Sequence, residues 1–491
     1  IIQEITEKRQ RLKNFTDISE TKAPIQIKAK LRHYQVEGLN WLNFLDEMQW
    51  GGILADDMGL GKTLQVLAFL QLQANKNKGA NLVVVPTTLL FNWENELKKF
   101  APKLKALYYY GNDREKDTTD FAKYDLVFTT YGVLVRDIQV LSRFRFNYAV
   151  LDESQAIKNP VSHRYKAACL INAFNKITLT GTPIENSTFD LFAQMSFVNR
   201  GFFGSVQKFR DDYSTPIDKD GNESIAGELN RIINPFVLRR TKEKVASELP
   251  DKTEDILYCE MEPDQRRVYD AWRNEYRNRL LSKIDEEGIE KSKLMVLEAL
   301  TRLRQICDSP LLLKSDDVVE NQSVKLKELV RHITLKTGKH KILIFSQFVK
   351  MLGLIKDELA KLNIEYEYLD GQSSSKQREQ SVNHFQENEN LRVFLISLKA
   401  GGTGLNLTAA DYVYIVDPWW NPAVETQAID RCHRIGQDKK VFAYRMICKN
   451  TVEEKILALQ DKKKKIAGDI IQTDESILKK LNTNDIRELF S

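Results

Sequence analysis

The sequence predicts an α/β protein with two parallel-sheet lobes and helical insertions between them. Short runs of β-branched and other apolar residues recur, and each is followed by a helix-favouring stretch, which is typical of parallel strands covered by helices on both faces. The runs form two sets, separated by an interval without them from about residue 187 to 340. The first set is Leu82–Val85, Leu126–Thr129, Tyr148–Leu151 and Ile177–Leu179, and the second is Ile342–Phe345, Val393–Ile396, Tyr412–Val416 and Val441–Tyr444.

The interval between the two sets is predicted to hold helices, loops and a hinge. Residues 263–284 and 290–306 are charged and helix-favouring, whereas residues 214–227 carry proline and glycine among polar residues and predict a loop. A second, acidic loop is expected at residues 315–323. The predicted domains are an N-terminal helical extension over 1–25, a first lobe over 26–238 with a helical protrusion near 187–235, a hinge (near 239–250) and helical protrusion over 239–325, a second lobe over 326–470 and a tail over 471–491.

Composition sets wide limits on function. At 491 residues the chain is long enough for about three domains. A net charge of +5 does not by itself indicate nucleic-acid binding, although a local basic groove is compatible with nearly equal numbers of basic and acidic residues. Five scattered cysteines without a C-x-x-C pair favour reduced thiols in an intracellular protein over a disulfide or zinc framework.

No apolar run approaches the about 20 residues needed to span a bilayer, so we expect no membrane partner. The chain begins at Ile1 without a methionine or signal-type segment, and we therefore expect it to be part of a longer protein. A run of four lysines, 462–465, lies on a helical pattern in the tail. It predicts a solvated face, with nucleic-acid contact or docking on the core as the alternatives.

A phosphate-binding loop is predicted at residues 57–63, whose sequence is DMGLGKT. It follows the apolar stretch 53–55 and precedes a helical pattern, which is the strand–loop–helix context that such a loop needs. Backbone N–H groups and the helix N-terminus should surround the phosphates, with Lys62 on the terminal phosphates and Thr63 on Mg²⁺. The residues expected to bind ATP here are Asp57, Gly59, Gly61, Lys62 and Thr63. The match to G-x-x-x-x-G-K-[ST] is imperfect, because Asp56 stands where the first glycine belongs.

Two adjacent carboxylates, Asp152 and Glu153, directly follow the predicted strand 148–151. An ATP hydrolysis site needs one carboxylate to hold Mg²⁺ and another to orient and deprotonate the attacking water. We assign the first role to Asp152 and the second to Glu153. The alternative is an acidic turn that caps the following helix.

Arg431 and Arg434 are three residues apart, which predicts that they share one face of a helix. Guanidinium groups match phosphate oxygens and keep their charge. Because these arginines belong to the second predicted lobe and Lys62 to the first, ATP should be hydrolysed between the lobes. The alternative is surface ion pairs with neighbours such as Asp430. Upstream of the phosphate loop, Gln35 carries the donor and acceptor that could bind the adenine edge.

Taken together, these segments resemble the motifs of SWI/SNF-type ATPases of helicase superfamily two, in the same order. The resemblance covers roughly residues 31 to 456 and includes the family's lack of the first Walker glycine. Departures are Ser154, where a smaller residue is commoner, and Asp57, where glutamate is commoner. The matching segments are 31–42 (adenine-binding Q motif), 55–63 (I), 84–93 (Ia), 129–131, 152–155 (the acidic box), 179–186 (III), 236–242 (interlobe signature), 344–348 (IV), 369–371, 397–407 (V), 417–422 and 427–437 (VI).

The resemblance implies two RecA-like lobes and ATP-driven translocation along double-stranded DNA, with ATP and Mg²⁺ as cofactors. It adds Arg32, Gly404 and Gln427 to the predicted nucleotide contacts. The DNA contacts that it implies are Pro86, Thr87, Thr130 and Tyr131 in the first lobe, and Ser346, Lys399, Gly401 and Thr403 in the second. We expect a monomeric motor core that acts on DNA in the nucleus of a eukaryote or the cytoplasm of a bacterium, with nucleosomes or other DNA-bound proteins as further partners.

Two alternatives remain beside the DNA motor. The first is a motor of the same superfamily directed to RNA or to the recycling of RNA polymerase; Thr180-Gly181-Thr182, in place of the Ser-Ala-Thr typical of RNA helicases, argues against it. The second is a catalytically inactive, nucleotide-gated scaffold, which would require damage at Lys62, Glu153 or Arg434. All three residues are intact.

Overall fold

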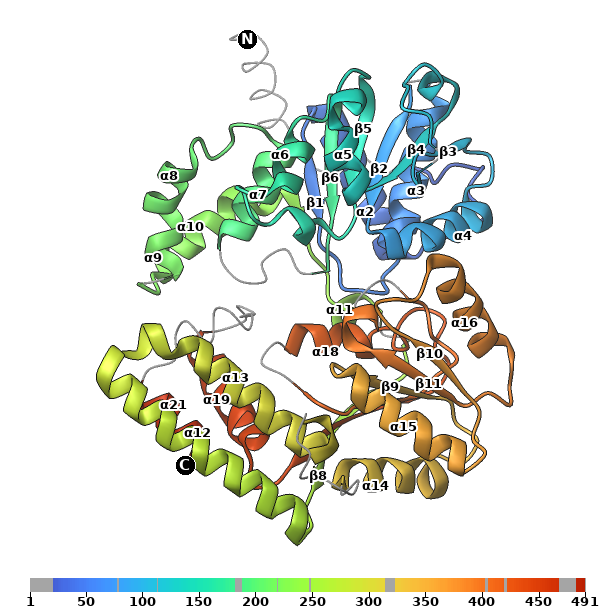
Figure 1. Cartoon of the computed structure of the whole chain (residues 1–491). Coiled ribbons are helices and arrows are strands. Elements are labelled where there is room, and N and C mark those ends of the chain that lie inside the picture. The colour runs from blue at the N-terminus through green and yellow to red at the C-terminus, as the bar shows by residue number, and fades with distance from the viewer. Residues whose placement is uncertain are drawn as a thin grey trace. The chain divides into compact units, whose positions relative to one another are not determined.

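The chain forms two compact units, residues 1–247 and 248–491, each built on its own parallel sheet (Figure 1). The computed structural model describes residues 21–76, 79–112, 114–181, 188–218, 220–246, 249–313, 323–401, 405–418, 422–467 and 483–490. Most of the expected N-terminal extension and C-terminal tail, and nearly all of the expected acidic loop, lie outside these residues. Within them, no helix combines the length and apolar character needed to cross a membrane.

The first unit contains a seven-stranded parallel sheet with the strand order β3-β4-β2-β5-β6-β1-β7. Its central strands are buried on both faces, as the continuous apolar runs predicted. In β2, for example, Leu82 and Val84 belong to one hydrophobic core, and Val83 and Val85 belong to the core on the opposite face. The strands are β1 (Gly52–Leu54), β2 (Asn81–Val85), β3 (Ala106–Tyr108), β4 (Leu126–Thr130), β5 (Phe146–Leu151), β6 (Ala173–Leu179) and β7 (Val237–Leu238).

Helices cover both faces of this sheet (Figure 1). The principal ones are α2 (His33–Met48), α3 (Lys62–Asn75), α4 (Leu90–Phe100), α5 (Tyr131–Leu141), α6 (His163–Cys169) and α7 (Thr188–Val198). Shorter helical segments follow at α8 (Val206–Phe209), α9 (Thr215–Asp218) and α10 (Glu223–Ile233).

The loop predicted at residues 214–227 is wrong in part, because α9 and the first half of α10 occupy most of it. Pro216 lies two residues after the wider π-helical turn Arg210–Ser214, within a helical stretch that is continuous from Val206 to Asp218. The Asn222 side chain caps α10 by accepting from the N–H of Ile225, and Leu229 and Ile233 bury one face of that helix against the core. Gly221 thus precedes α10, whereas Gly227 lies inside it.

The second unit contains a six-stranded parallel sheet with the order β10-β11-β9-β12-β13-β8. Its strands are β8 (Lys252–Cys259), β9 (Ile342–Ser346), β10 (Tyr366–Leu369), β11 (Val393–Ser397), β12 (Tyr412–Ile415) and β13 (Val441–Cys448). Its helices are α12 (Pro263–Glu287), α13 (Ile289–Asp308), α14 (Val324–Arg331), α15 (Val349–Lys361), α16 (Ser375–Glu387), α17 (Leu398–Gly401), α18 (Pro422–Ile429), α19 (Val452–Ala467) and α21 (Thr483–Leu489).

The interval 239–325, predicted as a hinge and helices, also supplies an edge strand. β8 pairs with β13 along eight residues, from Lys252 beside Val441 to Cys259 beside Cys448. The predicted helices are confirmed as α12 and α13, which lie side by side (Figure 1) and bury Tyr269, Leu280 and Leu300 in the core of the second unit. This part of the predicted insertion therefore belongs to the second lobe.

Candidate nucleotide site and nucleic-acid-facing segments

The phosphate loop connects β1 to α3, and its backbone requires glycine at two positions. Gly59 and Gly61 have φ angles of 86° and 77°, in the left-handed region that favours glycine. A Cβ atom at Gly61 would also lie 2.6 Å from Nε2 of Gln35. Lys62 begins α3, and its ammonium donates to the carbonyl oxygens of Asp56 at 2.5 Å and Asp57 at 3.2 Å. The loop thus has the predicted conformation, with its lysine held over it.

The first turn of α2 is bonded directly to this loop. The Tyr34 hydroxyl and the Gln35 amide both donate to the carbonyl oxygen of Leu60, at 3.1 and 3.2 Å. The Arg32 N–H donates to Oε1 of Gln35 at 3.0 Å. Gln35 is therefore buried beside the phosphate loop. Adenine binding by Gln35 stays a prediction.

Asp152 and Glu153 lie directly after β5. Asp152 is 8% exposed, and its two carboxylate oxygens accept from the indole N–H of Trp93 at 2.8 Å and from the Glu153 N–H at 2.9 Å. Burial, together with the charge of Glu153, raises the pKa of Asp152 to about 7. A buried carboxylate of this kind is stabilised in its ionised form by a cation.

Glu153 adopts a left-handed backbone conformation, with φ 48° and ψ 55°, which is uncommon for a residue with a side chain. Its carboxylate accepts from the Gln155 amide at 2.7 Å, and Gln155 in turn accepts from the Thr180 hydroxyl at 3.4 Å. Glu153 makes no side-chain hydrogen bond that caps the short helix 154–157. The capping alternative is therefore wrong, and the strained backbone fits a functional position.

Lys62 and the acidic pair are close in space. Burial lowers the pKa of Lys62, and the charges of Glu153, Asp56, Asp152 and Asp57 oppose that effect. Thr63 and Asp152 offer the hydroxyl and carboxylate oxygens that Mg²⁺ prefers, and the crowded negative charge favours a divalent cation. The donor set therefore fits Mg²⁺ with ATP. The sequence had placed these residues in separate motifs, and the fold gathers them at the carboxyl ends of β1 and β5.

Asp56, in the position of the missing Walker glycine, is the centre of a buried polar cluster that the sequence did not predict. Its carboxylate is 0% exposed and forms a two-bond ion pair with Arg240, Nε to Oδ1 at 2.9 Å and Nη2 to Oδ2 at 2.5 Å. Arg240 also donates to Gln65 Oε1 at 2.8 Å and to the carbonyl oxygen of Tyr34. Its own carbonyl accepts from the Asp57 N–H at 2.9 Å. The interlobe signature is therefore fastened to the phosphate loop.

Replacing Arg240 with alanine is expected to lower the local stability around the phosphate loop by about 3–5 kcal/mol, because the Asp56 carboxylate stays buried without its partner. Hydrogen exchange at the amides of Ala55 and Asp57, which donate to the Leu238 and Arg240 carbonyls, measures this change. Arg239→Ala removes the neighbouring exposed guanidinium and should change exchange by less than about 0.5 kcal/mol. Equal protection in Arg240→Ala and the wild type would contradict the prediction.

The predicted helix through Arg431 and Arg434 is wrong, because α18 ends at Ile429 and both arginines lie in the turns that follow. The reason is competition for carbonyl groups. The Arg431 carbonyl accepts from the Leu407 N–H at 2.9 Å, and the Cys432 carbonyl accepts from the Gln437 amide at 3.1 Å. Three-residue spacing therefore does not place the two guanidinium groups on one helical face.

The two arginines also differ in exposure. Arg431 is 1% exposed, which excludes an exposed surface ion pair. Arg434 is half-buried, and its guanidinium donates to the Leu405 carbonyl at 3.3 Å. Gln427 is half-buried on α18, and Gly404 lies outside the described residues. Of the predicted phosphate-binding groups in the second unit, Arg434 is thus the more accessible arginine.

Comparison with known proteins gives the family. Residues 34–312 match the SNF2-related domain, and residues 324–436 match the helicase conserved C-terminal domain. The first match alone spans more than half of the chain. The chain belongs to the SNF2-related family.

Several relatives of this SNF2-related chain carry functional names. It is 39% identical to the putative ATP-dependent helicase/translocase YwqA of Bacillus subtilis, over 97% of this chain and 52% of that protein. It is 33% identical to the TATA-binding protein-associated factor MOT1 of Saccharomyces cerevisiae, over 96% of this chain and 29% of that protein. A solved structure, the Sulfolobus solfataricus SWI2/SNF2 ATPase core in complex with dsDNA, is 39% identical, with 96% and 99% of the two chains covered and a TM-score of 0.48. The chain spans about half the length, or less, of the curated relatives that it matches.

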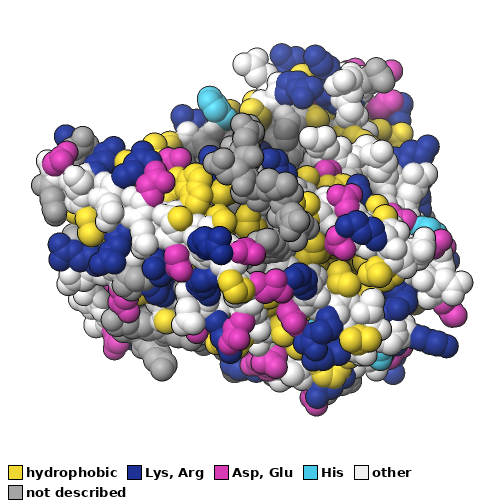
Figure 2. All heavy atoms as spheres, turned by 60° about the horizontal axis from the view of Figure 1, so that its bottom comes forward, with side chains coloured by type: hydrophobic (Ala, Val, Ile, Leu, Met, Phe, Trp, Pro, Cys, Tyr) yellow, Lys and Arg dark blue, Asp and Glu magenta, His cyan; other side chains and the backbone are white. Residues whose placement is uncertain are grey.

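The predicted DNA contacts of this SNF2-related chain are exposed to different degrees. Thr87 and Lys399 are exposed and Pro86 is half-buried, whereas Thr403 lies outside the described residues. The side chains of Thr130, Tyr131 and Ser346 are buried, so a DNA contact there would use the backbone. Gly401 packs closely, since a Cβ there would lie 2.5 Å from the Phe345 ring. These contacts stay predictions; on the face in Figure 2, basic and acidic side chains are interspersed, so charge alone does not mark a path for DNA.

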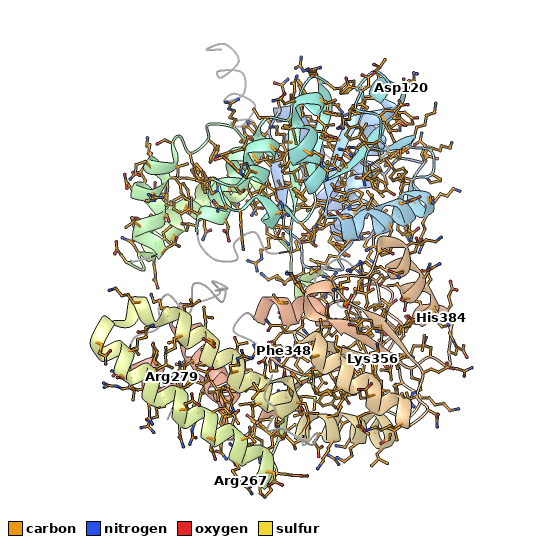
Figure 3. All side chains as sticks on the ribbon, viewed as in Figure 1. Asp120, Arg267, Arg279, Phe348, Lys356 and His384 are labelled. Carbon is orange, nitrogen blue, oxygen red and sulfur yellow. The ribbon has the colours of Figure 1, made fainter. Side chains whose placement is uncertain are left out.

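A second buried polar network follows β9 and β12 in the second unit. Arg304 of α13 donates to the carbonyl oxygens of Asp417 and Pro418 at 2.9 and 3.2 Å, and the Asp417 carboxylate accepts from the Gln347 N–H at 2.9 Å. The Arg304 guanidinium lies 5.4 Å from the centre of the Phe348 ring, a residue labelled in Figure 3. The network joins two segments that resemble family motifs, and the sequence did not predict it.

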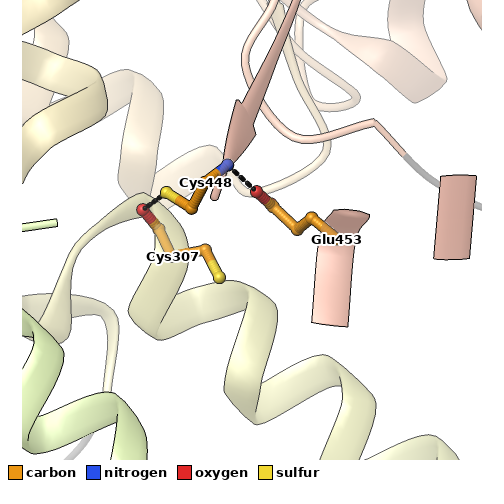
Figure 4. Close-up of side chains that lie close together, drawn as sticks. All are labelled: Cys307, Cys448 and Glu453. Atoms are coloured by element: carbon orange, nitrogen blue, oxygen red, sulfur yellow. Dashed lines mark hydrogen bonds between the residues drawn. The ribbon is translucent and has the colours of Figure 1, made fainter. Parts of the chain in front are cut away.

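Cys307, Cys448 and Glu453 bring potential metal-ligand atoms together in the core of the second unit (Figure 4). The Glu453 carboxylate is already bonded, however, because it accepts from Lys325 at 2.6 Å and from the Cys448 N–H at 3.0 Å. Burial also raises the pKa of the Cys448 thiol well above its usual value. The chemistry of this cluster therefore fits a buried structural core whose polar groups bond each other.

Proposed function

We propose that this chain is a DNA-dependent ATPase that moves along double-stranded DNA. The observation that carries the proposal is the gathering of Lys62, Asp152 and Glu153 at the strand ends of one sheet, beside a phosphate loop with the required backbone. Membership of the SNF2-related family and the helicase/translocase name of the Bacillus relative support it. The cofactors of the proposed reaction are ATP and Mg²⁺.

In the proposed reaction, the loop backbone and Lys62 bind the phosphates, Thr63 and Asp152 hold Mg²⁺, and Glu153 takes the proton of the attacking water. Mg²⁺ supplies charge neutralisation at the phosphate oxygens when it is bound. The buried position of Asp152 and the bond from Gln155 to Glu153 fix the two carboxylates in different environments, as different roles require. Arg434, together with Arg431, is proposed to stabilise the charge that develops on the transferred phosphate.

Movement along DNA would follow from alternating grips of the two units on one strand. Contacts with phosphates carry no base code, so little sequence preference is expected. Nucleosomes or other DNA-bound proteins are proposed as the obstacles that such an intracellular motor displaces.

Adding duplex DNA to the full chain should raise ATP turnover at least ~10-fold, since an arginine brought to the phosphates is worth a factor of ~10³–10⁵. A coupled ATPase assay measures turnover with duplex DNA, single-stranded DNA and single-stranded RNA of equal length. The DNA affinity should fall with salt, by a log–log slope of about −0.9 for each phosphate contact.

Stimulation by duplex DNA above that by RNA supports the proposal. The RNA-directed alternative predicts the reverse order, with single-stranded RNA as the better activator. Equal turnover with and without every nucleic acid would contradict both.

A further inference from the structure

The predicted DNA-facing segments of the first unit flank the strand that carries Asp152. The strand order β4-β2-β5 places the carboxyl ends of these three strands next to each other. Pro86 and Thr87 follow β2, Thr130 ends β4, and Asp152 follows β5. The Asp152 N–H also donates to the carbonyl oxygen of Val84 in β2, at 2.9 Å. A displacement of the carboxyl end of β2 or β4 would therefore occur close to Asp152, the proposed Mg²⁺ ligand.

The segment after β2 and the segment after β4 each contribute one aromatic side chain that bonds Asp152. Trp93, on the helix α4 that follows Thr87, donates its indole N–H to the Asp152 carboxylate at 2.8 Å. Tyr131, directly after Thr130, donates its hydroxyl to the Asp152 carbonyl oxygen at 2.8 Å. One bond holds the side chain of Asp152 and the other holds its backbone. Two segments far apart in sequence thus converge on one residue.

Both aromatic rings are tightly packed, so a small displacement of either segment would also move its ring. Trp93 is 1% exposed and Tyr131 is 4% exposed, so each ring moves with the segment that carries it. The Trp93 ring also lies 5.9 Å from that of Phe128 in β4, which joins the two DNA-facing segments. Hydrogen bonds weaken steeply when their geometry changes, and a bond to an ionised group is a strong one.

We propose that Trp93 and Tyr131 are positioning residues through which DNA, bound on the segments after β2 and β4, sets the orientation of Asp152 and so the rate of ATP hydrolysis. This inference rests on the proposed function and names the regulation of that same site. Neither residue touches ATP or DNA through its side chain; each acts through Asp152.

The test compares Trp93→Phe and Tyr131→Phe with two matched controls in the same unit. Each variant deletes one N–H or O–H donor and keeps an aromatic ring. Tyr109→Phe deletes a buried hydroxyl that donates to Asp137 at 3.2 Å. Tyr148→Phe deletes a buried hydroxyl that donates to Asp46 at 2.7 Å. Tyr148 lies on β5, the strand that precedes Asp152. Neither control bond reaches Asp152, so general loss of a buried hydrogen bond is accounted for.

Trp93→Phe and Tyr131→Phe should each lower DNA-stimulated kcat about 10-fold, the effect of losing one bond to a charged or catalytic group. The KM for ATP and the Kd for duplex DNA, measured by fluorescence anisotropy, should stay within about 2-fold of the wild type. The controls should keep the full stimulation. The two substitutions should combine non-additively, because both act on Asp152.

A binding measurement without turnover gives a second readout. Mg²⁺ should tighten the binding of a fluorescent, non-hydrolysable ATP analogue less in Trp93→Phe than in the wild type, and equally in Tyr148→Phe and the wild type. Unchanged DNA stimulation in both Trp93→Phe and Tyr131→Phe would overturn the inference and leave the proposed function standing. Loss of stimulation in the controls as well, or in step with lost DNA affinity, would also overturn it. A wild-type chain that DNA does not stimulate would overturn the proposed function and the inference together.

Discussion

Glu153→Gln is expected to lower the ATP turnover number by about 10²–10⁴-fold, the usual contribution of a general base, while ATP binding stays nearly unchanged. The substitution keeps the size of the side chain and its ability to pair with Gln155, which now bonds the Glu153 carboxylate at 2.7 Å. It removes the group that would accept a proton from the attacking water. A coupled assay gives turnover with duplex DNA present, and titration with a fluorescent ATP analogue gives affinity.

The matched control is Glu94→Gln on α4, which deletes a carboxylate paired with Lys98 at 2.7 Å in the same unit. That ion pair is partly exposed, so its loss should leave turnover within about 2-fold. If Glu153→Gln retained more than a tenth of wild-type turnover, the role assigned to Glu153 would be wrong. If Glu153→Gln abolished nucleotide binding as well, Glu153 would be required for the structure of the phosphate loop.

Most of the strands that the sequence predicted are buried on both faces. In β2, every residue from Leu82 to Val85 is fully buried, so the apolar run is continuous and easily recognised. β8 was missed because it lies at the sheet edge and carries charged residues. Glu254 in β8 accepts from Arg445 of β13 at 2.9 Å, so its charge is compensated by a residue far along the chain. Sequence patterns indicate burial well, but they do not indicate which distant residue compensates a buried charge.

The same limit applies to the candidate site. The phosphate loop and the acidic pair are short, local segments, and their residue types alone indicate which groups bind phosphate or metal. Trp93 and Arg240 bond to partners 59 and 184 residues away, which leaves no local pattern. The one available signal was Asp56, a charged residue directly after the apolar stretch 53–55, because a buried carboxylate requires a partner. Ser154, a departure from the family pattern, likewise has a distant partner, because its hydroxyl donates to Gln194 at 2.7 Å.

The helix predicted through Arg431 and Arg434 failed for a related reason. Periodicity assumes that backbone carbonyls accept from N–H groups of the same helix. Here the Leu407 N–H and the Gln437 side chain bond the carbonyls of Arg431 and Cys432 instead. Exposure then separates the two arginines, and only Arg434 has a guanidinium that is more than slightly exposed.

Arg434→Ala should therefore give the largest loss of activity in the second unit, about 10³-fold or more in DNA-stimulated kcat. The half-buried guanidinium donates to the Leu405 carbonyl at 3.3 Å, and guanidinium groups bond phosphate oxygens more strongly than neutral carbonyls. ATP affinity without DNA should change by less than about 3-fold, because the phosphate loop and Lys62 belong to the first unit. Rapid-quench measurement of a single turnover separates the hydrolysis step from product release.

Two further variants identify what Arg434 contributes. Arg434→Lys keeps the charge and loses the planar fork, so it should recover only a small part of the lost rate if two parallel bonds to phosphate are required. Lys439→Ala removes an exposed cation five residues away and should leave kcat within about 2-fold. Full activity in Arg434→Ala would move the role to Arg431, whose buried side chain would then have to become exposed during the reaction. A loss of ATP affinity equal to the loss of kcat would instead show that Arg434 binds the ground state as strongly as the transition state, and would contradict its assignment as a group that acts on the developing charge.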